Sequence, residues 1–580
     1  MKFTEQALTL LGKHYAQRPD ETPKDVFSRA AYAYASSPEH GARMLSYMLQ
    51  SWFIPSSPIV SNAPLPGSKQ HGLPIACYLL DVPDTIQGQK QKLLELAALS
   101  VAGGGVGMHN SIRAVSDKAP GPIPYMKVVD SMIGYFRQGR TRRGSLAYYM
   151  DVNHPDIVEH ILFRKRHGGD AARKADNKKN FHCAVNITDD FMHAVLNNYP
   201  YYLVDPSNGA VVEQVQARDI WELILKTRAE TGEPYLHFID ESNRQLPTAL
   251  KAAGLRVRGS NLCSEITLAT APDYTAVCCL GSLNLEKFTE WHGTLCVQDC
   301  VEYLDNVLDA FINEVDNSDN EDLRRAATSA RSERSIGLGT MGWHSFLQSK
   351  GIAFDSTGVD SAASWNYRVF KYIKDEAMVA TRRLAAVRGE PLLLRGTGVR
   401  NAHLLAIAPN SNSSILADCS PSIEPLVGNV FTSTTRAGAH TVRNKYLYQA
   451  MKEKYPDKAD DEAVWRDIEK HDGSVQHLKW LDAETKAVFK TAFEIDQHFV
   501  VEQAAVRQQF ICQAQSLNLF FGAGADADYV NSVHLMAWKN KLKTLYYYRT
   551  ENKQKFDTAK EIERRPLEEW ASEECISCQA

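Results

Sequence analysis

The amino-acid sequence predicts an α/β protein built on a barrel or a wound sheet. From about residue 71 to residue 440, short apolar or β-branched runs alternate with amphipathic segments of helical length. Strands are expected at 75–80, 276–285 and 404–408, and helices at 87–102, 219–230, 297–315 and 359–385. This alternation is typical of α/β folds, because their helices cover the faces of a mainly parallel sheet.

Helical segments flank this central region. Residues 1–70 are expected to form a small helical region, since 24–37 and 39–52 carry apolar residues at three- and four-residue spacing. Residues 444–485 are charged and helical, which predicts a surface insertion within a main domain spanning 71–550. The remaining expected segments are helices at 495–517 and 529–541, a strand at 543–549, and a flexible polar tail over 551–580.

Composition excludes several classes of protein. The chain has 580 residues, of which 44% are hydrophobic and 23% charged, with a formal net charge of -4. This charge gives no electrostatic case for binding nucleic acid or a membrane surface. The start of the sequence has no long apolar run and no small-residue cleavage site, and no stretch of apolar residues is long enough for a membrane span. We therefore expect a cytoplasmic protein, or one of the host cytoplasm if the source is a virus.

Eleven cysteines are scattered along the chain without an export signal, which predicts reduced thiols in place of a disulfide framework. Two of them, Cys575 and Cys578, stand among the last six residues. A chain end with nothing after it to pack against is mobile. This pair therefore predicts a carrier of reducing equivalents, whose target would be a second dithiol inside the same protein.

Common ligand motifs give little guidance. The run Gly103-Gly104-Gly105-Val106-Gly107 is rich in glycine but does not have the G-x-G-x-x-G spacing of dinucleotide sites. The single C-x-x-C has no second ligand pair near it, so we expect no metal site in this chain.

Three internal cysteine-containing segments stand out, at 76–80, 260–266 and 277–285. In the second segment Asn261, Cys263 and Glu265 alternate, so an extended backbone would place their side chains on one side. An amide, a thiol and a carboxylate on one face predict a reaction site. The alternative is a loop with one buried cysteine and two surface polar residues.

These segments, in this order and separation, resemble the catalytic large subunit of ribonucleotide reductase. The run from Lys541 to Tyr547 is similar to the K-T-L-Y-Y segment of class I large subunits, and the terminal cysteine pair is similar to their redox tail. Five separated motifs in the family's order form a specific signal. The resemblance implies a ten-stranded α/β barrel with a central finger loop, and Cys263 is expected at the tip of that loop.

The resemblance also implies the chemistry. Cys263 would hold a transient thiyl radical that removes the 3′-hydrogen of the ribose. Glu265 would act as the base at the 3′-hydroxyl, and Asn261 would hydrogen-bond the substrate. Cys77 and Cys278 would be the dithiol that reduces the 2′ position and closes to a disulfide, which the terminal pair then reduces by exchange.

Tyr548 and Cys279 each lie next to an expected functional residue but are not expected to share its role. Tyr546 and Tyr547 would relay the radical to Cys263 from outside, whereas Tyr548 falls outside the matching pair. Consecutive tyrosines are also ordinary in a strand, which is the bland alternative. Since neighbours on a strand face opposite ways, only one of Cys278 and Cys279 can face the site, and we expect Cys279 to serve packing.

A substrate-phosphate site is expected where residues 409–415 follow a predicted strand and open a predicted helix, because N–H groups at a helix start attract anions. A plain helix cap is the alternative. The family often has glutamate at the position of Ser411 and serine at the position of Ala76. By resemblance, the substrate-binding residues are Ser57, Ala76, Asn410, Ser411, Asn412, Ser413 and Ser414.

A second nucleotide site, for an allosteric effector, is implied near the start of the helix expected at 87–102. The loop 137–145 carries four arginines and resembles the flexible reading loop of this specificity site. A solvated basic turn is the alternative for this loop. By resemblance, the effector-binding residues are Asp84, Thr85, Ile86, Arg113 and Arg142.

The implied partners follow from the same resemblance. A ferritin-like, metal-containing small subunit would supply the radical, and thioredoxin or glutaredoxin would reduce the tail. The chain itself would bind a ribonucleotide substrate and NTP or dNTP effectors with Mg²⁺, hold no other cofactor, and form a homodimer. Since only a short helical stretch precedes Cys77, we expect the N-terminal ATP-binding cone and inhibition through it to be missing.

Three alternatives stay open from the sequence. An adenosylcobalamin-dependent class II reductase makes its radical in the same chain and can also end in a cysteine pair, but the paired tyrosines favour class I and a diphosphate substrate. A thiol-disulfide carrier without radical chemistry would explain Cys575 and Cys578 but not Asn261, Cys263 and Glu265. The third is a non-catalytic nucleotide-binding scaffold.

Overall fold

The computed structural model describes residues 3–65, 67–68, 72–136, 145–165, 181–435 and 438–551. It opens with a small helical region made of α1 (Glu5–Leu10), α2 (Pro23–Ala33), α3 (Pro38–Leu49) and α4 (Ser57–Asn62). Helices α2 and α3 begin where the sequence predicts. Each starts with a proline after a hydroxyl residue, Thr22 or Ser37, whose side chain accepts a hydrogen bond from a backbone N–H of the first turn.

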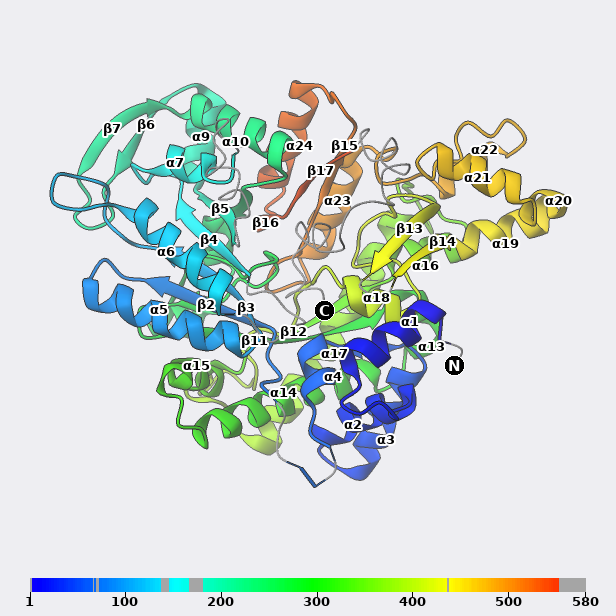
Figure 1. Ribbon diagram of the computed structural model, residues 1–580, viewed down its shortest axis with the longest axis horizontal. Helices are drawn as coiled ribbons and strands as arrows, with labels where there is room; N and C mark the ends of the chain where they lie inside the picture. The colour runs from blue at the N-terminus through cyan, green and yellow to red at the C-terminus, as the bar shows by residue number, and fades with distance from the viewer. Residues whose placement is uncertain are drawn as a thin grey trace.

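The core of the molecule is a mixed sheet that curls into a barrel (Figure 1). Five parallel neighbours form one wall: β2 (Cys77–Val82), β3 (Gly105–Asn110), β4 (Leu146–Asp151), β5 (Phe181–Ile187) and β8 (Tyr235–Phe238). At the two ends of this wall lie β16 (Thr544–Leu545), antiparallel to β8, and β11 (Ala276–Asn284), antiparallel to β2. Strand β12 (Ile336–Met341) runs parallel to β11, and β1 (Phe53–Pro55) pairs with β11 outside the ring.

Two segments that form only isolated bridges close the ring. Leu338 of β12 donates its N–H to the Leu404 carbonyl at 2.8 Å, and Ile407 donates to Ala514 at 3.1 Å. Beyond that, Tyr546 donates to Leu517 at 2.8 Å, directly after β16. Eight strands and the segments 404–408 and 513–517 therefore make ten extended segments around the barrel, which confirms the predicted ten-stranded α/β barrel.

Two expected elements are shorter than the sequence suggests. The run 404–408 was expected as a continuous strand, but its residues make only single bridges to β12 and to Gln515. The helix expected over 495–517 is α23 (Gln497–Gln508), which ends before the chain enters the barrel wall. In both places apolar residues are buried by barrel closure, so hydrophobicity alone did not reveal the local backbone.

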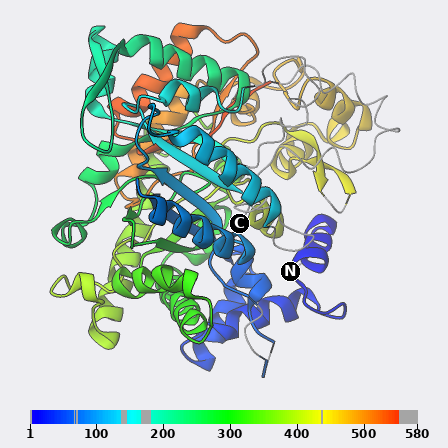
Figure 2. The same ribbon diagram turned by 60° about the vertical axis from the view of Figure 1, so that its left-hand side comes forward.

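Helices surround the barrel, and five long ones are close to their expected positions: α5 (Ile86–Val101), α10 (Ala217–Thr231), α14 (Cys296–Asp316), α17 (Ala362–Arg388) and α24 (Ala527–Lys539). Helix α6 (Pro122–Tyr135) was not among the predicted elements. The insertion expected at 444–485 contains α19 (Lys445–Lys454), α20 (Pro456–Ala459), α21 (Glu462–Lys470) and the start of α22 (Ala483–Val488). It has a separate small core and projects to one side (Figures 1 and 2). None of the helices in the described ranges combines the length and apolarity needed to cross a bilayer.

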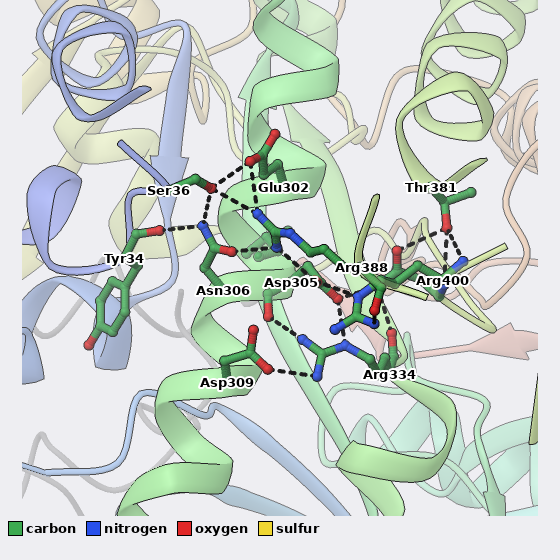
Figure 3. A network of polar contacts seen from close by, with 12 residues as sticks. Tyr34, Ser36, Glu302, Asp305, Asn306, Asp309, Arg334, Thr381, Arg388 and Arg400 are labelled. Atoms are coloured by element: carbon green, nitrogen blue, oxygen red, sulfur yellow. Dashed lines mark hydrogen bonds and ion pairs between the residues drawn. The ribbon is translucent and has the colours of Figure 1, made fainter. Parts of the chain in front are cut away.

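A buried ion-pair network ties the helical N-terminal region to the barrel (Figure 3). At its centre, the Asp305 carboxylate of α14 accepts hydrogen bonds from Arg334 at 2.7 Å, Arg400 at 3.0 Å and Arg388 at 3.1 Å. Arg388 of α17 also donates to the Ser36 hydroxyl, between α2 and α3, at 2.9 Å. Burial would raise the pKa of Asp305, but Arg334 and Arg400 outweigh burial and lower it.

We expect Asp305→Asn to lower the free energy of unfolding by about 3 kcal/mol, because it leaves three guanidinium groups without their buried counter-charge. Urea denaturation measures this loss. The matched control is Asp309→Asn, since the Asp309 side chain is 47% exposed and the substitution is expected to cost less than about 1 kcal/mol. Because the pKa of Asp305 is lowered in the folded state, its stabilising contribution is present at neutral pH and lost as the pH falls through that lowered value. Equal stability of the two variants would contradict the assignment.

Candidate active site

Four segments that are distant in the sequence meet in one cluster of buried side chains inside the barrel. The cluster contains Cys77 from β2, Cys278 from β11, Cys263 from the loop before β10 (Ala269–Thr270), and Tyr546 and Tyr547. All three cysteines are at most 1% exposed. The structure therefore brings together the thiols and the aromatic pair that the sequence singled out.

Cys77 and Cys278 face one another directly, because they are paired residues in the antiparallel ladder between β2 and β11. Directly opposite residues of such a ladder have Cα atoms about 4.5–5.5 Å apart, which lies in the range of about 4.4–6.8 Å found in disulfides. Both thiols are free in this structure. The pair can therefore close to a disulfide without separation of the two strands.

Amide groups contact both sulfur atoms of this pair. Asn261 donates from Nδ2 to Cys77 Sγ at 3.2 Å, and Gln513 donates from Nε2 to Cys278 Sγ at 3.7 Å. Burial, with smaller contributions from Cys279 and Cys77, raises the pKa of Cys278 well above its ordinary value. Cys278 is therefore a thiol at neutral pH and retains a proton and an electron that it can donate.

The segment 261–266 is a tight turn, so the extended backbone expected there is wrong. Ser264 has a left-handed backbone with φ of 67°, and its N–H donates to the Asn261 carbonyl at 3.3 Å. The Asn261 side chain closes the turn by accepting from the Ile266 N–H at 3.1 Å. The turn still gathers the expected groups, because Ser516 Oγ donates to the Cys263 carbonyl at 2.6 Å and lies 3.1 Å from Glu265 Oε2.

This turn is held inside the barrel by contacts with two wall strands. Tyr149 of β4 donates from Oη to the Asn261 carbonyl at 2.8 Å. On β3, a Cβ atom at Gly107 would lie 1.7 Å from the Ser260 carbonyl oxygen, so only glycine lets the loop pass there. No sequence motif indicated Tyr149 or Ser516, because each acts through a contact with residues far away in the chain.

The paired tyrosines interrupt the strand expected over 543–549. The chain leaves β16 at Leu545 and starts β17 (Tyr548–Thr550) after the pair, changing its partner from β8 to β15 (Leu519–Phe521). Tyr546 and Tyr547 lie between these short strands with ring centroids 4.3 Å apart. Tyr548 instead stacks on Phe521 at 4.5 Å, in the main hydrophobic core.

Cys279 points away from the cluster, as strand alternation predicts. Its Sγ donates to the Leu304 carbonyl of α14 at 3.3 Å, and the side chain packs in the main core. Cys183, Cys296 and Cys300 pack in the same core.

The expected substrate-phosphate segment begins next to the cysteine cluster, to which Ala76 and Ala408 belong. Helix α18 (Ser411–Ala417) follows Asn410, whose φ is 59°. The Asn410 side chain is occupied within the protein, since it donates to the Thr340 and Ala408 carbonyls, each at 2.9 Å. The first N–H groups of α18 have no acceptor within the helix itself. Ser57 begins α4, with Oγ 2.7 Å from the Tyr15 hydroxyl.

The expected effector residues gather at the N-terminus of α5. Asp84 accepts from the Arg113 backbone N–H at 2.9 Å and from Arg113 Nε at 2.6 Å. Thr85 caps the helix by accepting from the Gly88 N–H, and the Ile86 side chain is 80% exposed. Three of the expected functional residues lie outside the described part of the chain: Arg142, Cys575 and Cys578.

A group of three side chains with metal-ligating atoms within 4.8 Å of one another occurs in the described ranges: Asp467, His471 and His477. It lies on the surface insertion and shares no residue with the cysteine cluster.

Known family models match both the barrel and the helical N-terminal region of the chain. The family model described as "Ribonucleotide reductase, barrel domain" matches residues 75–394 and 392–548, and "Ribonucleotide reductase, all-alpha domain" matches residues 1–68. The chain is 46% identical over 579 residues to a putative ribonucleoside-diphosphate reductase large subunit of Frog virus 3 (isolate Goorha), covering all of this chain and 98% of that protein. It is 39% identical to the ribonucleoside-diphosphate reductase large subunit of Invertebrate iridescent virus 3, covering 94% of each chain.

Among solved structures, the chain is similar to the class Id ribonucleotide reductase alpha subunit of Actinobacillus ureae, with a TM-score of 0.83 and 32% identity over 95% of this chain and 97% of that one. The resemblance inferred from the cysteine and tyrosine segments is therefore confirmed. With a matching barrel, a matching helical region and relatives of nearly equal extent, the chain belongs to the ribonucleotide reductase large-subunit family.

Proposed function

We propose that this chain is the catalytic subunit of a class I ribonucleoside-diphosphate reductase, which makes 2′-deoxyribonucleotides through a thiyl radical on Cys263. The observation that carries the proposal is the single buried cluster in which Cys263 lies with the paired thiols of Cys77 and Cys278. A thiol-disulfide carrier would explain the dithiol but not the third buried thiol, that of Cys263, or the Glu265 carboxylate, which Ser516 also contacts.

The first step is removal of the 3′-hydrogen of the ribose by the sulfur of Cys263. Burial suits this step, because it keeps external thiols, oxygen and other species that react with a sulfur radical away from Cys263. Glu265 takes the 3′-hydroxyl proton as general base. The Ser516 hydroxyl donates to the Cys263 carbonyl and its oxygen lies 3.1 Å from Glu265 Oε2, so one side chain contacts both the radical-bearing residue and the base.

The second step reduces the 2′ position. The 2′-hydroxyl leaves as water, and Cys77 and Cys278 together supply two electrons and two protons and become a disulfide. Cys263 then returns the 3′-hydrogen and regains its radical, so the net change is one ribonucleotide and two thiols converted to one deoxyribonucleotide, one disulfide and one water. The raised pKa of Cys278 supports this role, since it keeps the proton on the sulfur until it is needed.

The nucleotides would occupy the two sites expected from the sequence. The diphosphate of the substrate would meet the N–H and hydroxyl groups of residues 410–414 at the start of α18, beside Ala76. The effector, with Mg²⁺, would bind near Asp84 and Arg113 at the start of α5. Arg142 would contact the effector or the substrate from the reading loop.

The site needs a source of the radical and a reductant for its disulfide, and each implies a partner. A ferritin-like small subunit would supply the radical, which enters through Tyr547 and Tyr546. Cys575 and Cys578 would reduce the buried disulfide and be reduced in turn by thioredoxin or glutaredoxin. A homodimer would form through α5 and α6, whose exposed apolar residues include Ile86, Leu94 and Tyr135.

Trapping of free thiols after one turnover tests the proposal. With substrate, effector and small subunit present but no external reductant, we expect a chain without its tail cysteines to form about one deoxynucleotide per active site and to lose the free thiols of Cys77 and Cys278 together. Removal of the tail cysteines by Cys575→Ser and Cys578→Ser keeps the disulfide in place for mass spectrometry. Cys278→Ser is expected to give no product, because one of the two electron donors is missing.

The matched control is Cys279→Ser, which changes the adjacent cysteine on the opposite face of the strand and is expected to react like the parent chain. A disulfide elsewhere, or none, would contradict the assignment of the dithiol. Formation of deoxynucleotide with adenosylcobalamin alone, without the small subunit, would show a class II enzyme instead.

A further inference from the structure

The paired tyrosines contact two aromatic side chains from neighbouring strands, which no motif in the sequence indicated. The ring of Tyr235, on β8, lies 4.7 Å from Tyr546 and 5.0 Å from Tyr547, measured between centroids. The imidazole of His182, on β5, stacks on Tyr235 at 5.5 Å and meets Tyr547 edge-on at 5.9 Å. Tyr235 and His182 therefore both pack against the ring of Tyr547.

A buried carboxylate holds the His182 ring in this position. Glu233 is 3% exposed, and its Oε1 lies 2.5 Å from His182 Nδ1. The second oxygen accepts from the Cys183 N–H at 3.1 Å and lies 3.4 Å from Arg164 Nε. Burial would raise the pKa of Glu233, but Arg164 and His182 outweigh it and lower the pKa.

The ionised carboxylate determines the tautomer of the histidine. Glu233 can only accept a hydrogen bond, so His182 must carry its proton on Nδ1. The Tyr547 hydroxyl oxygen lies 3.5 Å from the same Nδ1. This distance is longer than a good N–H···O bond, but hydrogen bonds at reaction sites commonly tighten once the complex is assembled.

We propose that His182, oriented by Glu233, is a positioning residue for Tyr547: its Nδ1–H is shared between the Glu233 carboxylate and the Tyr547 oxygen. This inference rests on the proposed radical relay. The Arg549 guanidinium, 4.4 Å from the Tyr547 ring centroid, covers the ring in addition. The Tyr547 backbone is held by hydrogen bonds with Asn518 and Leu519, but these bonds do not themselves set the position of the phenol oxygen. The His182–Glu233 pair restrains this oxygen atom, where the radical must arrive from the small subunit.

The test uses 3-aminotyrosine in place of Tyr547, since this residue is oxidised more easily than tyrosine and retains the radical for spectroscopy. In the complex with small subunit, substrate and effector, we expect high-field EPR to show a hydrogen-bonded radical. With His182→Leu, the bond is lost and the gx value rises. In chains that keep Tyr547, His182→Leu is expected to lower kcat by about tenfold or more with substrate KM within about twofold, and His182→Gln, which keeps an N–H donor, to recover part of the rate.

The matched control is His160→Leu. His160 of α7 (Ile157–Leu162) is also buried, and it donates to the Ala184 carbonyl of the same strand β5 and not to the tyrosine pair. It is expected to leave both kcat and the EPR spectrum unchanged. A radical whose gx value is the same with and without His182 would overturn the positioning role. Absence of any radical on the aminotyrosine in the parent chain would instead contradict the proposed relay, so the two failures are distinguishable.

Discussion

The variant Cys263→Ser is expected to form no deoxynucleotide, while it binds substrate and effector as tightly as the parent chain. Serine has nearly the same size as cysteine, and the site is 1% exposed, so the turn 261–266 should keep its hydrogen bonds. An O–H bond is much stronger than an S–H bond, however, and the relay cannot form an oxygen radical there. Product formation is measured by chromatography and nucleotide affinity by equilibrium dialysis.

The comparison for Cys263→Ser is Cys183→Ser, which changes a buried cysteine of the main core. That variant is expected to lose some stability by burying a hydroxyl but to retain turnover below its unfolding temperature. Turnover of Cys263→Ser at the parent rate would remove the radical mechanism. Loss of nucleotide binding in the same variant would show that Cys263 acts through the fold.

The variant Tyr547→Phe is expected to abolish turnover in the presence of the small subunit. Phenylalanine keeps the ring that packs on Tyr546 and under Arg549, so the structure should be unchanged. It has no hydroxyl hydrogen to give up, and at neutral pH its ring is far harder to oxidise than a phenol. Steady-state reduction with the complete enzyme measures the effect, and we expect a loss of at least about 10³-fold, which corresponds to about 4 kcal/mol in the barrier.

Tyr548→Phe is the matched control for this loss, because it removes a hydroxyl from the next residue in the chain. Tyr548 stacks on Phe521 in the main core and does not belong to the cysteine cluster. We expect Tyr548→Phe to turn over at close to the parent rate. Normal turnover of Tyr547→Phe, or an equal loss in both variants, would refute the relay.

The sequence predicted the fold class well, because alternating strands and helices leave a local pattern. The long helices α5, α10, α14 and α17 were found by their apolar spacing. Closure of the barrel left no such pattern. The segments 404–408 and 513–517 contribute single bridges between distant strands, and pairing between distant segments cannot be read from periodicity.

In the candidate site, too, residues within local motifs were predicted and residues that depend on distant contacts were not. Its cysteines and tyrosines stand in recognisable motifs, so the resemblance found them. The turn at 261–266 was missed, because a serine with φ of 67° at Ser264 is imposed by surrounding contacts and not by its own preference. Ser516, His182 and Glu233 were missed because their relevance depends on neighbours that only the folded barrel provides.

The glycine run 103–107 has a purpose different from the one its composition suggests. Phosphate-binding loops use glycine so that a ligand can approach the backbone. At Gly107, the group that approaches the backbone belongs to the protein itself, since the Ser260 carbonyl lies where a methyl group would be. A single methyl group at this position would clash with the Ser260 carbonyl and displace the loop that carries Cys263. The loop inside the barrel therefore requires glycine at position 107, whichever nucleotide the enzyme reduces.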